Sequence, residues 1–396
     1  MKLKFISTFA VAIGVALANK ELFSLHKDLI IRPSITRNET LAVDFLSNYL
    51  EQNGWKVELQ DVINPNIDSS IKRQNIFAYL NKPEDVKILL NSHTDVVPPY
   101  VEYKETVDDQ GRELIYGRGA NDAKGQIAAQ VIAVEELRKK NPEIVKHVGV
   151  LYDPGEEGIF DGATFAQEIL PKNLEYVIVG EPTELVQITG HKGNMGFEIR
   201  AKGLAAHSSS PHWGVNAIEK LSEAILKLES VTLPKDKLLG DTTMAVTKIS
   251  GGTAMNKVPD EATAYVNVRT SVPSEETWKA IKGSGLESEW IDLVLVDDPH
   301  DPVIKLNDFM KLDTIENWRS SQTMPFGTDF FAWKHPTVKK ILIGCGSVAS
   351  AHKLDEHIYK QELLDGVDMY VELVEGLLTG KLKVAGGHTK HEKDEL

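Results

Sequence analysis

The chain has 396 residues and 42% hydrophobic composition, so it can bury a large core, and its length suggests two domains or one domain with a large insertion. Its 58 acidic residues outnumber its 44 basic ones and give a formal net charge of −14. No basic block could neutralise a phosphate backbone, which argues against nucleic-acid binding.

The first eighteen residues have the three parts of a secretory signal. Lys2 and Lys4 precede an apolar run over residues 5–17, and the small-residue segment ALA ends at residue 18. We therefore expect residues 1–18 to be removed and the mature chain to begin at Asn19. No later segment approaches the ~18 consecutive apolar residues of a membrane span, so no spanning helix is expected.

Apolar runs then alternate with segments of helical periodicity, which predicts an α/β catalytic domain with a mostly parallel central sheet. Helices are expected over residues 38–52 and 126–138. Short buried strands are expected over residues 86–90, 147–152, 176–179 and 339–343. A His or an acidic residue follows each of these strands: His93, Glu156 with Glu157, Glu181 and His352. Because ligands in such sheets bind beyond the carboxyl ends of the strands, these side chains predict a site there.

The pattern changes between residues 190 and 297. Alternating strands are expected over residues 197–201, 244–250 and 262–270, together with helices over residues 215–229 and 274–283. This predicts an inserted α+β domain with an antiparallel sheet. The catalytic domain is then divided into residues 19–189 and 298–380, and residues 381–396 form a polar tail.

Five candidate residues have the chemistry of ligands to metals that activate water: His93, Asp122, Glu157, Glu181 and His352. Such metals bind His nitrogen and carboxylate oxygen and leave one position open for water. Five groups fit a centre in which one carboxylate bridges two ions ~3.5–4 Å apart. The same ligands accept Co²⁺ and Mn²⁺ as well as Zn²⁺.

Five ordered motifs carry a family resemblance: HTDVVP at residues 93–98, YGRGANDAKG at 116–125, GEEG at 155–158, GEPT at 180–183 and GLAAHS at 203–208. They resemble those of the co-catalytic zinc hydrolases of the MH clan, which include aminoacylase, glutamate carboxypeptidase, acetylornithine deacetylase and succinyl-diaminopimelate desuccinylase. The chain looks most like secreted fungal probable carboxypeptidases. The resemblance covers nearly the whole mature chain and implies the zinc-hydrolase fold, in which the inserted domain serves as a lid or a dimerisation domain.

The resemblance implies two zinc ions per subunit. His93 and Glu181 would bind one ion, Glu157 and His352 the other, and Asp122 would bridge them. In the family, the peptide bond that follows the bridging aspartate tends to be cis.

Adjacent Glu156 and Glu157 need different tasks, because two anionic ligands side by side would mainly repel each other. The resemblance implies that Glu156 is the general base. Asp95 would accept the second ring N–H of His93 and thereby fix the tautomer of that ring.

The resemblance also assigns roles in and after the inserted domain. His207 would stabilise the tetrahedral oxyanion, often across a homodimer interface. Asn256 and Arg269 would hold the substrate carboxylate, a task that suits the bidentate fork of Arg. Gly327 begins a loop that would line the site. Four other histidines are interpreted as surface or loop residues: His191, His212, His335 and His357.

The predicted activity is zinc-dependent hydrolysis of an amide bond in a peptide or N-acyl amino acid with a free carboxylate, which describes a metallocarboxypeptidase. Within the family, Glu at position 181 accompanies carboxypeptidases and deacylases. An acetylornithine-deacetylase-like N-deacylase is therefore an alternative. A non-catalytic lumenal binding protein on the same scaffold is an alternative of another class, but it predicts lost ligands, and all five candidates are present.

The chain ends in Lys393-Asp394-Glu395-Leu396, which spells an endoplasmic-reticulum retrieval signal. Together with the signal segment it predicts residence in the reticulum lumen through a retrieval receptor, and a secreted or vacuolar location if retrieval fails. Asn38 begins a glycosylation sequon, which fits a lumenal surface. Cys345 is the only cysteine, so the chain can form no internal disulfide.

Overall fold

The computed structural model describes residues 19–296, 307–333, 335 and 337–385. They divide into two compact units. The first unit runs to Thr189 and includes Leu312–Gln322 and the chain from Ala332 onward, while the second comprises Gly190–Lys311 and Thr323–Phe331. The predicted signal segment and retrieval tetrapeptide lie outside the described residues. No helix among the described residues is long and apolar enough to cross a membrane.

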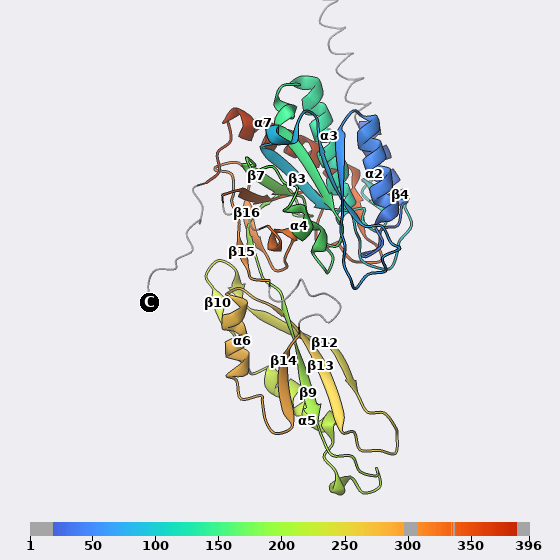
Figure 1. The fold of residues 1–396 in the computed structure, drawn as a ribbon, viewed down its shortest axis with the longest axis vertical. Coiled ribbons are helices and arrows are strands. Elements are labelled where there is room, and N and C mark those ends of the chain that lie inside the picture. The colour runs from blue at the N-terminus through green and yellow to red at the C-terminus, as the bar shows by residue number, and fades with distance from the viewer. Residues whose placement is uncertain (1–18, 297–306, 334, 336, 386–396) are drawn as a thin grey trace, which may run out of the picture. The chain divides into compact units, whose positions relative to one another are not determined.

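A mixed sheet forms the centre of the first unit (Figure 1). Its strands, in spatial order, are β1 (Lys56–Asp61), β2 (Gln74–Tyr79), β6 (Val148–Asp153), β3 (Ile88–His93), β7 (Tyr176–Val179), β17 (Lys339–Leu342) and β8 (Gln187–His191), whose end continues into the second unit. Strands β6, β3, β7 and β17 are parallel, and they are the four strands predicted from the sequence. The flanking strands β1, β2 and β8 pair antiparallel and were not predicted.

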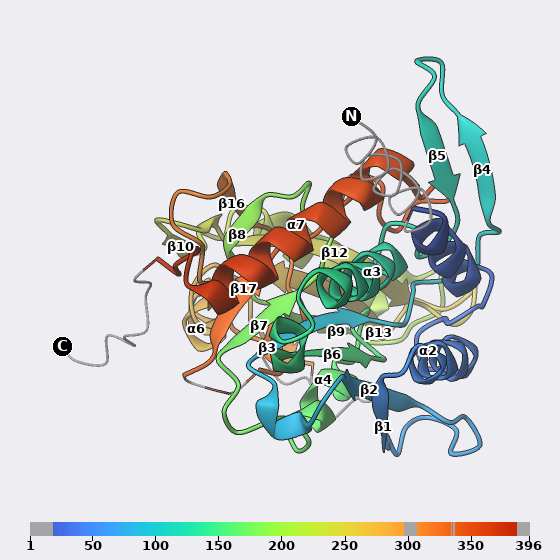
Figure 2. The same cartoon turned by 90° about the horizontal axis from the view of Figure 1, so that it is seen from above.

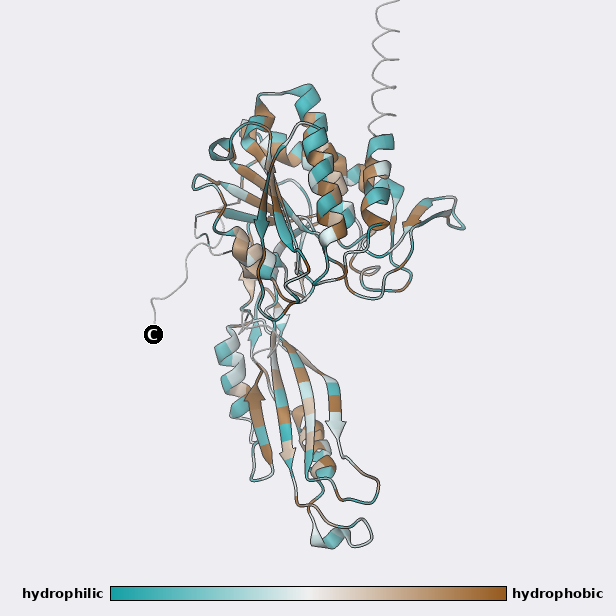
Figure 3. Cartoon of the chain, turned by 45° about the vertical axis from the view of Figure 1, so that its right-hand side comes forward, coloured by the Kyte–Doolittle hydropathy of each residue, from teal (hydrophilic) through white to brown (hydrophobic). Residues whose placement is uncertain are grey.

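The central strands are apolar because they are covered on both faces. Every residue of β2, β3 and β6 is buried. Helices α3 (Lys124–Lys140) and α7 (Lys360–Thr379) lie side by side along the sheet (Figure 2). Helices α2 (Thr40–Gln52) and α4 (Asp161–Ala166) pack against β2. Figure 3 shows that apolar residues line the helices and strands of this unit.

A small sheet of three strands links the end of the chain to its first third. It contains β18 (His357–Tyr359), β5 (Glu113–Tyr116) and β4 (Lys104–Val107) in that order. Strand β5 leads into the turn that carries Asp122, and β18 follows the loop that carries His352. These three strands were not predicted from the sequence.

The second unit contains a four-stranded antiparallel sheet, as predicted for the inserted domain. Its order is β12 (Thr243–Gly251), β13 (Glu261–Arg269), β9 (Met195–Lys202) and β14 (Ile291–Leu295). Helices α5 (Ala217–Leu228) and α6 (Ser274–Lys282) share one apolar core with this sheet. The short strands β10 (Lys235–Asp236) and β11 (Gly240–Asp241) pair with each other. The short strands β15 (Met310–Lys311) and β16 (Ser321–Met324) instead pair with β8 of the mixed sheet.

Candidate metal centre

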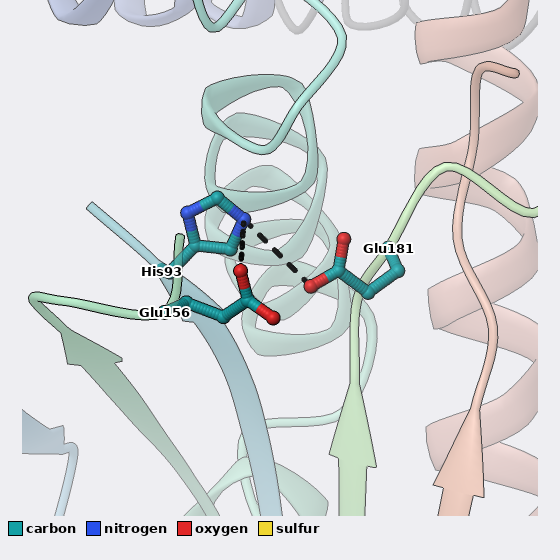
Figure 4. A group of neighbouring side chains, drawn as sticks. All are labelled: His93, Glu156 and Glu181. Carbon is teal, nitrogen blue, oxygen red and sulfur yellow. Dashed lines mark ion pairs between the residues drawn. The ribbon is translucent and has the colours of Figure 1, made fainter. Parts of the chain in front are cut away.

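The predicted ligand residues meet at the carboxyl ends of the parallel strands. His93 is the last residue of β3, and Glu181 follows β7 by two residues. Glu156 and Glu157 follow β6 in a short turn. Figure 4 shows the side chains of His93, Glu156 and Glu181 pointing toward one another from three separate segments. The edge of the sheet expected from strand order is therefore where the acidic and His side chains gather.

The carboxylates of the site fall into two groups, one around the imidazole of His93 and one around that of His352. His93 Nε2 lies 3.1 Å from Asp122 Oδ1, 3.7 Å from Glu181 Oε1 and 4.0 Å from Glu156 Oε2.

His352 Nε2 lies 2.9 Å from Glu157 Oε2 and 3.3 Å from Asp122 Oδ2. Asp122 thus directs one carboxylate oxygen to each imidazole, which is the arrangement of a ligand shared by two ions.

The donor set fits two divalent cations. Ligand bonds of about 2.1 Å in a tetrahedral site separate neighbouring ligand atoms by roughly 3.4 Å, and the nitrogen-to-oxygen distances in the cluster run from 2.9 to 4.0 Å. Four carboxylates surround the two imidazoles, and two divalent cations would supply the matching positive charge. All six side chains except that of His352 are buried or nearly so, which favours charge neutralisation within the site.

The site's carboxylates perturb both imidazoles. Burial lowers the pKa of His93, but hydrogen bonds with Asp122 and Asp95 outweigh burial and raise this pKa well above its ordinary value. Hydrogen bonds with Asp122 and Glu157 raise the pKa of His352 to about 10. Burial, with the charge of Asp122, raises the pKa of Glu157 to about 7. A cation binding here must displace protons, so its affinity should rise with pH.

The ring of His93 is oriented by the backbone of Asp95. His93 Nδ1 lies 3.0 Å from the Asp95 carbonyl oxygen and 3.5 Å from Asp95 Oδ1. From the sequence, the Asp95 carboxylate is the expected acceptor, whereas the carbonyl oxygen is the closer one. Either contact protonates Nδ1 and leaves Nε2 as the nitrogen that faces the cluster.

The Asp95 carboxylate instead holds the turn that carries the two glutamates. Its Oδ1 accepts the N–H groups of Gly155 (2.9 Å) and Glu156 (3.0 Å), and its Oδ2 accepts the N–H of Glu157 (3.2 Å). The Thr36 hydroxyl donates to the same Oδ2 at 2.8 Å. These bonds fix both glutamates relative to His93, a task that the motif alone did not reveal.

A buried ionic network lies behind that turn. Arg73 bonds Asp161 (Nη1 to Oδ2, 2.5 Å) and Glu39 (Nε to Oε2, 2.9 Å), and at most 1% of each side chain is exposed. A Cβ on Gly155, whose φ is +91°, would lie 2.5 Å from Asp161 Oδ1 and 2.8 Å from Arg73 Nη2. Only glycine fits there. Sequence reasoning missed this network, because its three members are far apart in the chain.

The segments that carry Asp122 and His352 both have unusual backbone conformations. The peptide bond from Asp122 to Ala123 is cis, as the resemblance implied. His352 has a positive φ of +64°, and 54% of its side chain is exposed.

His207 and Asn256 are neighbours within the second unit. The Asn256 carbonyl oxygen accepts the N–H of Ser208 at 3.0 Å. The His207 side chain is exposed, and its Nδ1 accepts the N–H of Ser209 at 3.2 Å. In the neutral ring, Nε2 must then carry the hydrogen and can donate it.

Arg269 lies at the opposite end of the same sheet. It is the last residue of the nine-residue strand β13, while Asn256 precedes the first residue, Glu261. A strand of this length spans about 27 Å. Within one chain, Arg269 and the pair His207 and Asn256 therefore cannot contact the same small ligand.

Gly327 falls in the second unit, where an ideal Cβ would lie 1.9 Å from the Phe331 ring, so a side chain there would force that ring to move. The Phe331 ring meets His191 edge-on, with centroids 4.9 Å apart. His191 is completely buried, so its interpretation as a surface or loop residue was wrong. His357 lies in β18 and is only partly buried, while His212 is exposed as predicted.

Comparisons with known proteins agree with this geometry. Residues 189–284 match the family model of a peptidase dimerisation domain. A probable carboxypeptidase of Talaromyces marneffei is 35% identical over 89% of this chain and 85% of its own length. A peptidase M20 domain-containing protein of Schizosaccharomyces pombe is 34% identical over 90% of this chain and 85% of its own length.

Solved structures share the fold. A tripeptidase from Staphylococcus aureus matches with a TM-score of 0.72 at 20% identity, covering 91% of this chain and 99% of that one. A dinuclear metal-binding peptidase of the M20 family from Bacillus subtilis matches with a TM-score of 0.62 at 15% identity, covering 92% of this chain and 99% of that one.

Proposed function

Because the chain belongs to the M20 family of metallopeptidases, we propose that it is a zinc-dependent carboxypeptidase acting on peptides or N-acyl amino acids with a free carboxylate. Its relatives include probable carboxypeptidases, and the chain is accordingly a hydrolase. The observation that carries the proposal is the Asp122 carboxylate, which directs one oxygen to each of two imidazoles among three further carboxylates.

The ligands divide into two sets. His93 and Glu181 would hold one ion, Glu157 and His352 would hold the other, and Asp122 would contact both. When bound, the two ions lower the pKa of a water molecule and polarise the carbonyl of the scissile bond.

Glu156 is the proposed general base. Its Oε2 lies 4.0 Å from His93 Nε2, so the carboxylate is at the centre without making the short contact to an imidazole that Glu157 makes. It would take the proton from water and deliver it to the departing amine. The bond from its N–H to Asp95 holds its backbone in place for both transfers.

A homodimer would complete the substrate site. His207 Nε2–H is a suitable donor to a developing oxyanion, and Arg269 suits a carboxylate. Since about 27 Å of strand separates them within one chain, they could serve one substrate only if two subunits contribute. Strand β12 supports such an assembly, because it is an exposed nine-residue edge strand that a second copy could pair with.

Exchange of the two adjacent glutamates for glutamine tests the mechanism. Glu156→Gln should retain two zinc ions per chain and lose roughly 10²–10⁴-fold in kcat on dipeptides and N-acyl amino acids. Glu157→Gln, the matched control, should lose zinc as well. Full activity in Glu156→Gln would exclude it as the base.

The same assay distinguishes the possible substrates. Trimming of longer peptides from the carboxyl end, followed by mass spectrometry, supports a carboxypeptidase, whereas cleavage of N-acyl amino acids alone supports an N-deacylase. A protein that holds two ions yet cleaves nothing in a broad amide library would be a binding protein.

Subunit complementation tests the shared site. His207→Ala and Glu156→Gln should each be inactive alone. Mixed after dissociation and reassembly, they should recover about a quarter of wild-type activity, since half of the dimers are hybrids with one intact site each. No recovery in hybrids shown to form would mean that His207 serves its own subunit or none.

We also propose that the protein resides in the endoplasmic-reticulum lumen, with residues 1–18 as entry signal and residues 393–396 as retrieval signal. A tag placed inside the chain, which leaves Leu396 free, should localise to the reticulum. Deletion of the last four residues should send the protein to the medium or the vacuole, and an unchanged location after this deletion would contradict retrieval.

A further inference from the structure

A buried glutamate that the proposed mechanism does not use, Glu356, joins the turn that carries Asp122 to the loop that carries His352. It lies four residues after His352, and only 1% of its surface is exposed. Its Oε1 accepts three backbone hydrogen bonds, from Gly119 (3.0 Å), Asn121 (3.2 Å) and Asp122 (3.1 Å). The backbone of the shared ligand is thus bonded directly to this carboxylate.

The other carboxylate oxygen binds Arg118, which reaches the second loop. Arg118 Nη1 lies 2.5 Å from Glu356 Oε2 and 3.1 Å from the Lys353 carbonyl oxygen. Arg118 Nη2 lies 3.5 Å from the His352 carbonyl oxygen. The Arg118 side chain is also buried, so this ion pair is shielded from solvent. One pair of side chains therefore contacts the backbone of both ligand-bearing segments.

Neither segment belongs to a regular element that could fix it. Residues 117–123 form a succession of turns, and His352 sits at a positive φ in another turn. Buried N–H groups in turns need acceptors that a helix or strand would otherwise supply. A carboxylate that accepts three of them forms charge-assisted bonds, which are stronger than neutral ones. Glu356 therefore fixes the backbone of this turn, as the hydrogen bonds of β3 fix the backbone of His93.

We propose that Glu356 is a positioning residue of the metal centre. Through the N–H of Asp122, and through Arg118 to the carbonyl oxygen of His352, it fixes the separation between two of the groups that hold the second ion. It acts through those residues and not on the substrate. The role rests on the proposed function, since it requires that both ions bind.

The test is Glu356→Asp, which keeps the negative charge beside Arg118 but withdraws the oxygens by one methylene, about 1.5 Å. The holoenzyme is dialysed against buffers of graded free zinc, and zinc per chain is measured by mass spectrometry. We expect the weaker of two ions to bind roughly 10–100-fold less tightly than in wild type. At saturating zinc, kcat should recover while KM for the substrate stays unchanged, which a merely structural role would not produce.

Glu135→Asp is the matched control, because Glu135 is a glutamate of the same unit that accepts a bond from Trp55 Nε1 at 2.7 Å. It should retain wild-type zinc affinity. Equal affinities in Glu356→Asp and the control would overturn the positioning role, as would a loss in Glu356→Asp that excess zinc does not repair in folded protein.

Arg118→Lys keeps the test decisive if Glu356→Asp does not fold. It retains the positive charge but loses the fork that reaches Glu356 and two carbonyl oxygens together. Its weaker ion should also bind about tenfold less tightly, and unchanged binding would overturn the proposal. A wild-type protein that holds fewer than two ions would refute the proposed function itself, which separates the two failures.

Discussion

The two ends of the metal centre differ in burial and in what holds them. At the first end, His93 is fully buried and Glu181 has a side chain only 6% exposed. At the second end, Glu157 is equally buried, but 54% of the His352 side chain is exposed. An ion at the second end therefore has a ligand open to water, and we expect it to exchange first.

The two ends also differ in what fixes the backbone of their His residues. His93 ends β3, which is paired on both sides within the sheet, so its position follows from the fold. His352 sits in a loop at a positive φ, and its position depends on hydrogen bonds made by Arg118 and Glu356. A site can thus combine one ligand fixed by a sheet with another fixed by a single buried ion pair.

The largest effect should come from the residue common to both ends. Asp122→Ala removes the carboxylate that faces His93 and His352 alike. Both ions should be lost, and kcat/KM should fall by roughly 10⁴-fold or more, or about 5 kcal/mol. Metal analysis with assays on the same preparation tests this. One ion retained at full occupancy would contradict a shared ligand.

Substitution of one His at each end should distinguish the two ions by how readily each is released. His352→Ala should retain the ion at the buried end, and His93→Ala should retain only the ion at the exposed end, which a chelator removes more readily; each variant should lose roughly 10²–10³-fold in activity. Zinc remaining after graded chelation measures the difference. Equal zinc loss in the two variants would show that exposure does not set the order of release.

Acid should destabilise the folded chain through His26, which bonds the turn that carries Asp122. Its Nε2 donates to the Ala120 carbonyl oxygen at 2.8 Å, two residues before Asp122, and burial lowers its pKa to about 4. The unfolded chain takes up this proton near pH 6.5 but the folded chain does not. The contribution to stability is thus complete above pH 6.5 and lost as pH falls toward 4, amounting to about 3 kcal/mol.

His26→Gln is the matched variant, because its amide can still donate to Ala120 but cannot titrate. Urea unfolding of both proteins between pH 7 and 4, under the same metal conditions, isolates the His26 contribution. The wild type should lose more stability over this range, and parallel curves would refute the assignment.

The central strands and the candidate ligands could be predicted from the sequence for a physical reason. A buried parallel strand must be a continuous apolar run, and the residues just beyond it must lie at one edge, so His93 and Glu181 could be placed from pattern alone. The antiparallel β1 was missed because it is a largely exposed edge strand without such a run. Roles that depend on contacts between residues distant in sequence could not be predicted. The carboxylate of Glu356, for example, accepts the N–H of Gly119, which lies 237 positions earlier in the chain.

Asp95→Asn should have a smaller effect than the variants above, and it tests a residue that contacts both ends of the metal centre. The Asp95 backbone orients His93, while its carboxylate holds the turn that carries Glu157. An asparagine oxygen can still accept two of the three N–H groups, but its NH₂ must then face the third. One buried donor is left unpaired, and the free energy of unfolding should fall by about 2 kcal/mol.

Thr36→Val is the control for this variant, since it removes a single donor to the same carboxylate and should cost about 1 kcal/mol. Denaturant unfolding in the presence of a chelator separates these costs from metal binding, and kcat measured at saturating zinc reports whether the turn has shifted. If Asp95→Asn cost no more than Thr36→Val and kcat were unchanged, the carboxylate would only fill space. In that case the backbone of β6 and the ionic network of Arg73 would suffice to hold both glutamates in place.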